Sequence, residues 1–469
     1  MIIDFKKISQ EMNKLLAEKS DKSRVTEILT KARELRGLED SEVLALLQIG
    51  ESEVELLQQL YHTASFVKEE IYGNRLVLFA PMYISNLCNN ECLYCAFRSS
   101  NKQLHRVALN QEEIAKETQT LIAQGHKRIL LVTGESYGQE GLNYIFRSIE
   151  TIYAQKEAKG NIRRINVNIA PLQEEEFKLL AKYPIGTYQL FQETYHQESY
   201  RKLHLKGAKA NYDFRLQTMD RALHAGLHDV GIGVLFGLYD WRYEMLAMLA
   251  HVRHLEAEFG VGPHTISVPR IEPAHNSKLS ERPPYEVSDS DFKKIIAVLR
   301  LAVPYTGIIL STRESAQMRR DAFALGISQI SAGSKTNPGG YGSASPGNHF
   351  CEEQFSLGDH RELAEVILDM VHLGYIPSFC TGCYRLGRVG ADFMDLAKPG
   401  AIKEHCMPNA LFTFAEYLYD FAPRGSELFM SGLSLIEKIL KEKIANPALV
   451  QNIQSELVKI ANGNRDIYW

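Results

Sequence analysis

Two groups of cysteines carry the chemistry that this sequence suggests. The seven cysteines lie at positions 88, 92, 95, 351, 380, 383 and 406. Cys88, Cys92 and Cys95 form a C-x3-C-x2-C triplet. Three thiolates on one loop can hold three corners of a cubane iron–sulfur cluster and leave the fourth iron open to an outside ligand. A structural zinc site is the alternative, but such sites usually take four protein ligands in C-x2-C pairs. The triplet therefore favours a cluster.

The second group lies near the end of the chain. Cys380, Cys383 and Cys406 follow a C-x2-C-x22-C spacing, which again supplies three thiolates. A second cluster with three protein ligands is one interpretation. A Cys3His zinc site completed by His405 or His372 is the other. Spacing alone leaves both open.

The cysteine distribution and the composition exclude several classes of protein. Disulfide frameworks spread pairs along short secreted chains, whereas these two groups lie far apart in a chain of 469 residues. Cys351 is left over, and we expect it to be a small buried apolar residue. The formal net charge of −4 gives no basic excess for nucleic acid or an anionic membrane. Without a membrane-length apolar run or a signal-peptide core, we expect a soluble, cytoplasmic protein.

Alternating strands and helices must position these cysteines. We predict eight strands, each followed by a helical stretch, at residues 76–84, 128–134, 165–170, 188–192, 230–236, 265–269, 307–311 and 327–333. Eight such units predict an α/β fold with a complete (β/α)8 barrel, and a doubly wound sheet is the alternative. We expect three domains: a helical extension at 1–74, the barrel at 75–339, and a mostly helical cluster-binding domain at 340–469.

Polar residues and glycines follow most of the predicted strands at the same end. They include Gly134, Glu135 and Ser136 after the second strand, Asn168 within the third, Glu193 after the fourth, and Ser311, Thr312 and Arg313 after the seventh. In barrels of this type the active site lies at the carboxyl ends of the strands. The first cysteine triplet follows the first strand directly, so all these residues are predicted to meet at one mouth.

The cysteine triplet, with Tyr94 before its last cysteine, resembles the radical S-adenosylmethionine (SAM) superfamily. The resemblance implies that the methionyl amino and carboxylate groups of SAM chelate the open iron. It also implies provisional SAM contacts. Gly134, Glu135 and Ser136 would receive the methionyl amino group, Glu193 would bind the ribose, Arg201 would pair with the carboxylate, and Asn168 would reach the same pocket. A surface cation is the alternative for Arg201.

Several further segments together resemble the radical SAM tyrosine lyases: NLCNNECLYCAFR, LLVTGES, YQLFQETYH, YRKLHLKG and ILSTRES. The resemblance spans most of residues 75–335 and implies that the substrate is L-tyrosine. The tyrosine carboxylate suits a fixed guanidinium, so Arg313, beside Ser311 and Thr312, is the expected clamp. A structural salt bridge from Arg313 to Glu314 or a nearby acid is the alternative.

Two groups of tyrosine lyase exist, one serving thiazole synthesis and one serving FeFe-hydrogenase maturation. The C-terminal cysteine set, with the same spacing, resembles the second group. That resemblance implies an auxiliary iron–sulfur cluster with an extra iron, which His264 helps to hold. His264 precedes the sixth predicted strand, whereas Arg270 follows it. Six residues at about 3.3 Å each would separate the two ends by roughly 20 Å.

The resemblance implies the following reaction. One electron cleaves SAM to methionine and a 5′-deoxyadenosyl radical, which takes a hydrogen from the tyrosine amino group. The Cα–Cβ bond then breaks to give p-cresol and dehydroglycine. Dehydroglycine becomes carbon monoxide and cyanide at the second cluster. The implied partners are hydrogenase maturation proteins and a reductant such as ferredoxin or flavodoxin.

Two rival hypotheses remain. The first is the thiazole-pathway lyase, with a zinc site in the tail. The second is a non-catalytic iron–sulfur carrier, which would not need the glycine and acidic residues at the second and fourth strand ends.

Overall fold

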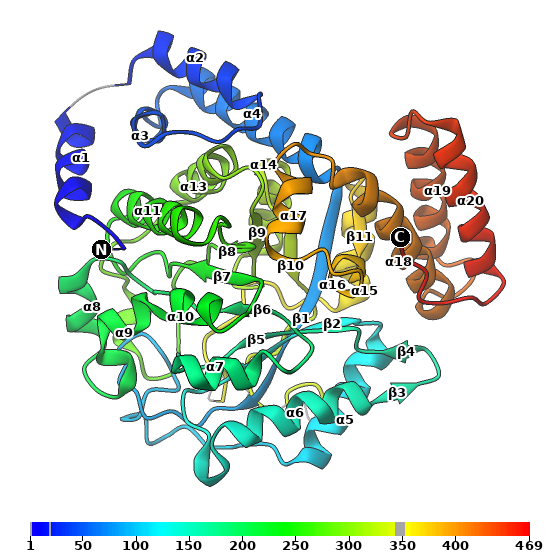
Figure 1. The fold of residues 1–469 in the computed structure, drawn as a ribbon, viewed down its shortest axis with the longest axis horizontal. Coiled ribbons are helices and arrows are strands. Elements are labelled where there is room, and N and C mark those ends of the chain that lie inside the picture. The colour runs from blue at the N-terminus through cyan, green and yellow to red at the C-terminus, as the bar shows by residue number, and fades with distance from the viewer. Residues whose placement is uncertain (1, 18–19, 343–351) are drawn as a thin grey trace.

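A closed ring of parallel strands forms the centre of the molecule (Figure 1). The structure is a computed structural model that describes residues 2–17, 20–342 and 352–469. The ring strands are β1 (Arg75–Ser85), β2 (Arg128–Thr133), β5 (Arg164–Asn168), β6 (Ile185–Gln189), β7 (Val230–Gly233), β8 (Thr265–Ser267), β9 (Gly307–Leu310) and β10 (Gln329–Ser331). The ring closes because β10 pairs with β1, with Val77 opposite Gln329. This closure confirms the predicted (β/α)8 barrel and excludes the doubly wound sheet.

The strand bounds differ most from prediction at the fourth strand. β6 starts at Ile185, three residues before the predicted start, and ends at Gln189. Its register follows from pairing with β5, in which Ile165 lies opposite Ile185. Pairing between strands depends on contacts distant in sequence, so the local pattern of apolar residues did not predict where this strand begins and ends.

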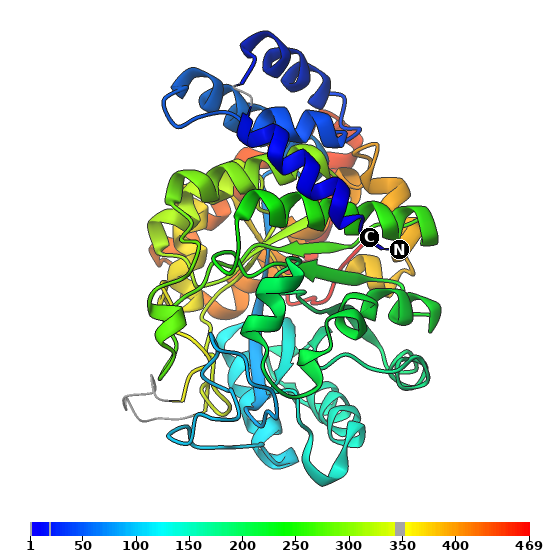
Figure 2. The same cartoon turned by 90° about the vertical axis from the view of Figure 1, so that its left-hand side faces the viewer.

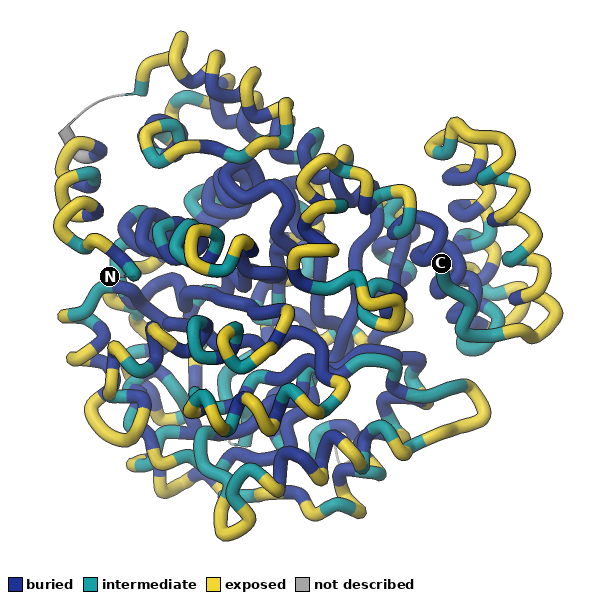
Figure 3. The backbone as a smooth tube through the Cα atoms, viewed as in Figure 1, coloured by how far each residue is buried: buried dark blue, intermediate teal, exposed yellow. Residues whose placement is uncertain are grey.

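Helices surround the ring and bury their apolar faces against it (Figure 3). They are α5 (Gln111–Gln124), α6 (Leu142–Ala154), α7 (Glu174–Leu180), α10 (Thr218–His224), α11 (Trp241–Phe259), α13 (Asp289–Ala302) and α14 (Ala316–Leu325). Shorter helices occupy the strand-to-helix loops, namely α8 (Gln197–Leu203), α9 (Tyr212–Leu216), α12 (Lys278–Glu281), η1 (Gly138–Glu140) and η2 (Ala208–Ala210). A small antiparallel hairpin joins β3 (Lys156–Glu157) to β4 (Gly160–Asn161).

Helix ends are fixed locally, as α5 illustrates. The Asn110 side chain accepts from the backbone N–H of Glu113, and the Glu113 side chain accepts from the backbone of Asn110. This capping box satisfies donors that the first turn leaves free. Gly125 ends the helix in a left-handed conformation, with φ at +104°.

In the described part of the N-terminal extension four helices precede the barrel, in line with the predicted helical character: α1 (Phe5–Ala17), α2 (Lys22–Ala32), α3 (Asp40–Leu47) and α4 (Val54–Tyr72). α4 packs on α13 and α14, and α1 packs on α11. Figure 2 shows these helices at the opposite end of the molecule from the loop after β1. They therefore leave the cysteine loop uncovered.

The C-terminal region is mostly helical, also as predicted. It contains α15 (Leu363–His372), β11 (Ile376–Ser378), α16 (Gly382–Arg385), α17 (Gly390–Ala397), α18 (Lys403–Phe421), α19 (Glu427–Glu442) and α20 (Pro447–Ala461). β11 pairs in parallel with the first residues of β1, with Arg75 opposite Ile376. This pairing attaches the C-terminal region to the amino ends of the ring strands.

The three predicted domain boundaries stay predictions. Cys351, predicted to be a small buried apolar residue, lies outside the described residues. Among the helices that the structure describes, none has both the length and the apolar character needed to cross a membrane.

Candidate functional site at the two ends of the barrel

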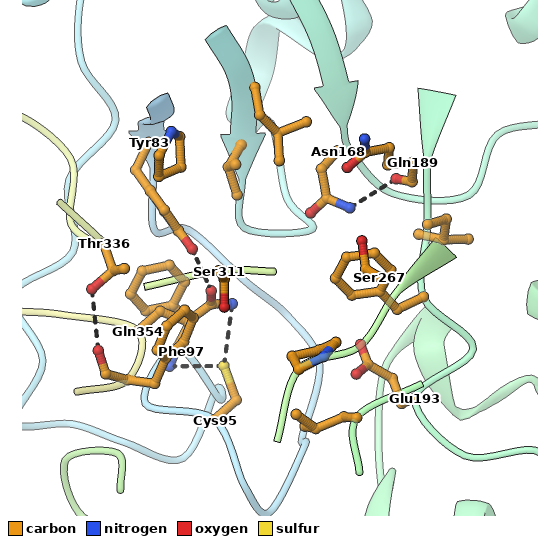
Figure 4. A pocket seen from close by; sticks show the side chains of 18 of the residues that line it. Tyr83, Cys95, Phe97, Asn168, Gln189, Glu193, Ser267, Ser311, Thr336 and Gln354 are labelled. Atoms are coloured by element: carbon orange, nitrogen blue, oxygen red, sulfur yellow. Dashed lines mark hydrogen bonds between the residues drawn. The ribbon is translucent and has the colours of Figure 1, made fainter. Parts of the chain in front are cut away.

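A large cavity opens at the carboxyl ends of the strands (Figure 4). It encloses about 1450 Å³ of space, open solvent included. The structure brings together here most of the residues predicted to meet at the mouth: Cys88, Cys92, Tyr94, Cys95, Gly134, Glu135, Asn168, Glu193, Ser311, Thr312 and Arg313. The end of the barrel that sequence reasoning chose is therefore the end with the large cavity.

The segment after α8 holds the cysteine loop in place. The backbone N–H of Leu93 donates to the carbonyl of Leu203 at 3.1 Å, and that of Glu91 donates to Lys206 at 2.9 Å. Gly207 has φ at +88°, and a Cβ there would lie 2.2 Å from Asn90 Oδ1. Only glycine fits this close approach. The YRKLHLKG segment thus acts as a clamp on the loop.

The three thiols of the loop suit a metal cluster. Burial raises the pKa of Cys95 to about 11, raises that of Cys88, and raises that of Cys92 well above its usual value. Buried thiolates of this kind need a bound cation to take their charge. The Cys95 sulfur accepts a hydrogen bond from the backbone N–H of Phe97 at 3.4 Å, and Gln354 Nε2 lies 3.8 Å from it. Such donors tune cluster sulfurs in iron–sulfur proteins, so the residues fit the predicted [4Fe–4S] cluster.

A network of four buried or half-buried charges crosses one wall of the cavity. Lys209 Nζ lies 2.6 Å from Glu193 Oε1, and Arg215 Nη1 lies 3.0 Å from Glu135 Oε1. Burial by itself would raise the pKa of both carboxyls, but Lys209 and Arg215 lower it below the usual value. Both acids are therefore held as carboxylates, able to accept hydrogen bonds from a ligand.

Sequence reasoning missed Lys209 and Arg215. Glu135 and Glu193, two acidic residues at strand ends, indicate that basic residues must lie nearby to balance their charge. The sequence does not show which of the many lysines and arginines do so. Arg201, predicted to pair with SAM, is instead exposed on α8 and is not among the described residues that line the cavity. Lys209 and Arg215 are instead the cations of this region that line the cavity wall.

Three other predicted SAM contacts lie in or beside the cavity wall. A Cβ on Gly134 would lie 2.2 Å from the carbonyl oxygen of Leu87, so glycine lets the end of β2 touch the cysteine loop. Asn168 Nδ2 donates to the carbonyl of Gln189 at 2.7 Å, as Figure 4 shows. Ser136 lies beside the cavity, and its hydroxyl accepts from Asn89 at 3.2 Å.

Arg313 reaches the cavity without an ion pair to any acidic residue that the structure describes. Its guanidinium carbon lies 3.2 Å from the centre of the Phe355 ring, and Nη1 lies 3.5 Å from the Arg270 carbonyl oxygen. The alternative of a salt bridge to Glu314 is wrong, because Arg270 binds that carboxylate, with Nε 2.9 Å from Oε1. Arg313 is therefore available to an anionic group in the cavity.

Glu272, which sequence reasoning also missed, lines the same cavity beside Arg313. Burial and the neighbouring Glu314 raise the pKa of Glu272 to about 7. Glu272 lies in the loop that follows β8. Residues that follow a barrel strand are expected at the mouth, so its position could have been predicted from the sequence.

A second cavity, of about 570 Å³ with open solvent included, lies at the amino ends of the strands. Cys380, Cys383, Cys406 and His264 all line it. β11 leads directly to Cys380, so its pairing with β1 delivers the C-terminal cysteines to this end. Neither His405 nor His372 is among the described residues that line the cavity, which removes the support for a zinc site completed by either.

Cations and hydrogen-bond donors surround the second set of thiols. Arg75 Nη2 donates to the Cys406 sulfur at 3.1 Å, and the backbone N–H of Gly382 donates to the Cys380 sulfur at 3.3 Å. The hydrogen bond from the Cys383 thiol, followed by the Arg75 guanidinium, lowers the pKa of Cys406. These donors stabilise cysteine sulfurs that carry negative charge, as metal-bound thiolates do. The residues therefore fit the predicted auxiliary cluster.

His264 lies between the barrel and the tail. Its Nδ1 is 3.4 Å from Asp229 Oδ1, and its Nε2 is 3.3 Å from the hydroxyl of Tyr384. A carboxylate facing Nδ1 favours a proton on that nitrogen, which leaves a lone pair on Nε2, the nitrogen beside the Tyr384 hydroxyl. Among the described residues, no three or more His, Cys, Asp or Glu side chains converge on one point that could hold a single ion.

Comparison with known proteins agrees with this geometry. The radical SAM superfamily matches residues 82–251, and the biotin and thiamin synthesis associated domain matches residues 267–376. The 2-iminoacetate synthase of Escherichia coli strain K12 is 33% identical over 333 residues, which cover 71% of this chain and 85% of that protein. The chain belongs to the radical SAM superfamily.

Two solved structures resemble the whole molecule. The crystal structure of HydG, a maturase of the [FeFe]-hydrogenase, is 46% identical with a TM-score of 0.94, covering 100% of both chains. HydG from Carboxydothermus hydrogenoformans is 42% identical with a TM-score of 0.82, covering 96% of this chain and 97% of that one. These similarities place the chain in the branch of the superfamily that contains HydG, and confirm the predicted radical SAM lyase.

Proposed function

We propose that this enzyme cleaves the Cα–Cβ bond of L-tyrosine to p-cresol and dehydroglycine, and converts dehydroglycine to carbon monoxide and cyanide for FeFe-hydrogenase assembly. The observation that carries the proposal is the pair of cavities at opposite ends of one barrel, each lined by three cysteines. A single lyase reaction needs only the first cavity. The similarity to HydG over the full chain supports the use of both.

At the first cavity, Cys88, Cys92 and Cys95 would hold a [4Fe–4S] cluster, which together with SAM supplies a 5′-deoxyadenosyl radical. The chain's own residues bind and orient. Glu193, kept ionised by Lys209, is placed to accept hydrogen bonds from the ribose hydroxyls of SAM.

Arg313 would bind the tyrosine carboxylate. Stacking on Phe355 fixes the plane of its guanidinium, so a carboxylate can meet two parallel N–H groups. Ser311 and Thr312 line the cavity on the same loop. The clamp would hold the amino group of tyrosine in one place relative to SAM, and the apolar walls would exclude water from a reactive radical.

At the second cavity, Cys380, Cys383 and Cys406 would hold the auxiliary iron–sulfur cluster, and His264 Nε2 would bind its extra iron. Arg75 would offset the thiolate charge through its hydrogen bond to Cys406. Asp229 would keep the proton on Nδ1 of His264. We further propose a cytoplasmic location, hydrogenase maturation proteins as partners, and ferredoxin or flavodoxin as the reductant.

Metal analysis of anaerobically purified protein tests the proposal. Two clusters predict about eight irons or more per chain, with matching sulfide and no zinc. About four irons plus one zinc would instead favour a tyrosine lyase of the thiazole pathway with a structural tail. Full iron content without any p-cresol in the presence of tyrosine, SAM and reductant would favour a cluster carrier.

A further inference from the structure

One acidic residue in the cavity at the carboxyl ends of the strands has no partner. The described acidic residues that line this cavity are Glu135, Glu193 and Glu272. Glu135 is paired with Arg215, and Glu193 is paired with Lys209. Glu272 is half-buried, and it forms neither a hydrogen bond nor an ion pair with a described residue. In the described cavity wall, its carboxylate is therefore the acid that can receive a cationic group.

Glu272 lies beside the proposed substrate clamp. Arg313 Nη1 approaches the carbonyl oxygen of Arg270 at 3.5 Å, and Glu272 is two residues further along the same loop. The guanidinium of Arg270 is engaged by Glu314 and Asp289, which leaves Glu272 unpaired. Because β8 and β9 are adjacent strands, the loops that follow them present a carboxylate and a guanidinium to the same cavity.

This pair of charges matches the two charged groups of an α-amino acid. In such a zwitterion, the carboxylate and the ammonium are attached to the same carbon atom. A substrate whose carboxylate pairs with Arg313 therefore carries its ammonium close to that guanidinium. Glu135 and Glu193 have cations beside them that would repel the ammonium. Glu272 is thus the acid of the described wall that suits it best.

We propose that Glu272 receives the α-ammonium group of tyrosine and accepts one of its protons. The N–H bond breaks, its electron pair stays on nitrogen as a lone pair, and a carboxylate oxygen of Glu272 gains the proton. The step needs neither an oxidant nor a reductant. It leaves a neutral amine, from which the radical of the proposed function takes a hydrogen atom. The inference rests on that proposed function and assigns it a proton acceptor.

The electrostatic surroundings of Glu272 suit this role. Burial, followed by the negative charge of Glu314, raises the pKa of Glu272 to about 7, although Arg313 and Arg270 act to lower it. Ordinary glutamate carboxyls titrate at about 4.3, and the α-amino groups of peptides at about 7.7–8.0. A carboxylate whose pKa is close to that of the amine takes its proton more readily than an ordinary carboxylate does. Glu272 can accept the proton above its pKa, where it is ionised, and not below it.

Ligand binding to the SAM-loaded holoprotein, kept oxidised so that no turnover occurs, tests the ammonium contact. The probes are L-tyrosine and 3-(4-hydroxyphenyl)propanoate, which is tyrosine without its amino group. At pH 8 tyrosine should bind at least about tenfold more tightly, as expected for one charged hydrogen bond. Glu272→Gln should remove most of that preference. The matched control, Glu286→Gln, is exposed on the same connection between β8 and α13 and should keep it.

Two results of this binding experiment would overturn the proposal. One is an unchanged preference for tyrosine in Glu272→Gln. The other is an equal loss of affinity for both probes, which would place Glu272 at the phenol or the carboxylate end of the substrate.

The pH dependence of p-cresol formation tests the proton transfer. At saturating tyrosine and SAM, kcat should rise with pH and reach half its maximum near the pKa of Glu272, about 7. Glu272→Gln should lower kcat by roughly 10²-fold and remove that rise. Its uncoupled 5′-deoxyadenosine formation should continue, which would show that the fold and the first cluster are intact.

An unaltered pH profile in Glu272→Gln would overturn the proposal. If the unsubstituted protein forms no p-cresol at all, the proposed function fails instead. The two failures can be told apart, because the binding experiment reports on Glu272 without turnover.

Discussion

At the scale of single residues, charge pairing determines which cations can meet a ligand. Arg270 and Arg313 follow neighbouring barrel strands, and both are half-buried. Arg270 is neutralised by Glu314 and Asp289, whereas Arg313 has no such partner among the described residues. Lys209 and Arg215 are likewise committed to Glu193 and Glu135. Arg313 is thus the cavity cation best able to bind a carboxylate.

Replacing Arg313 with lysine tests this assignment. The charge is kept, but the planar fork that grips a carboxylate is lost. Losing one charged hydrogen-bonding partner typically costs ~1.5–3 kcal/mol. Tyrosine affinity should fall accordingly, while uncoupled 5′-deoxyadenosine formation continues. Arg201→Lys, an exposed position outside the cavity, is the control and should not change the tyrosine dependence. An unchanged tyrosine Kd in Arg313→Lys would place the clamp elsewhere.

At the scale of elements, each cysteine group depends on a segment remote from it in sequence. The first loop is clamped by residues 203–207 through backbone hydrogen bonds. The second group depends on β11, which pairs with β1. A cluster loop that lacked such support would not keep three thiols facing one volume.

Gly207→Ala tests whether residues 203–207 hold the cysteine loop in place. The new Cβ would meet Asn90 Oδ1 at 2.2 Å, on a backbone whose φ is +88°. Gly226 has a similar φ of +92° but no atom within 4 Å of a built Cβ. Both substitutions therefore carry the left-handed strain of about 1–2 kcal/mol, and only Gly207→Ala adds the clash. We expect Gly207→Ala to lose about four irons per chain and Gly226→Ala to keep them. Equal iron content in the two variants would show that the contact does not support the loop.

At the scale of the whole molecule, the barrel separates two sets of thiols. One cavity lies at the carboxyl ends of the strands and the other at the amino ends. The two steps of the proposed reaction should therefore be separable by mutation.

Cysteine variants test that separation. Cys92→Ala should abolish both 5′-deoxyadenosine and p-cresol, because radical generation needs the first set. Cys383→Ala should still form p-cresol but release little or no carbon monoxide. Normal carbon monoxide release from Cys383→Ala would make the tail structural and would exclude the proposed second step.

His264 offers a finer test at the same scale. His264→Ala and His264→Asn should leave p-cresol formation nearly intact, while the extra iron, measured by metal analysis, is lost. Loss of a group that orients a metal-binding histidine typically weakens metal binding about 10–100-fold, so Asp229→Asn should weaken the extra iron without abolishing it. A parallel fall of p-cresol and iron in the His264 variants would indicate a general folding defect and remove His264 from the ligand set.

Several features of this protein depend on short-range spacing and could be predicted before the fold was known. The C-x3-C-x2-C triplet, the alternation that produces eight parallel strands, and the polar residues at the strand ends all follow from local pattern. Because parallel strands in a barrel share one direction, residues after each strand must meet at one mouth. That rule correctly placed Glu135, Glu193 and Arg313 in one cavity.

Which charges pair with one another could be seen only in the folded molecule. The sequence pointed to Arg201 as a SAM contact, whereas Lys209 and Arg215, which it did not single out, are the cations that line the cavity. It could not show that Glu314 binds Arg270 or that Asp229 faces His264. Ion pairing and burial depend on distances of a few ångströms between residues far apart in the chain. Those distances are set by how the strands, helices and tail pack together.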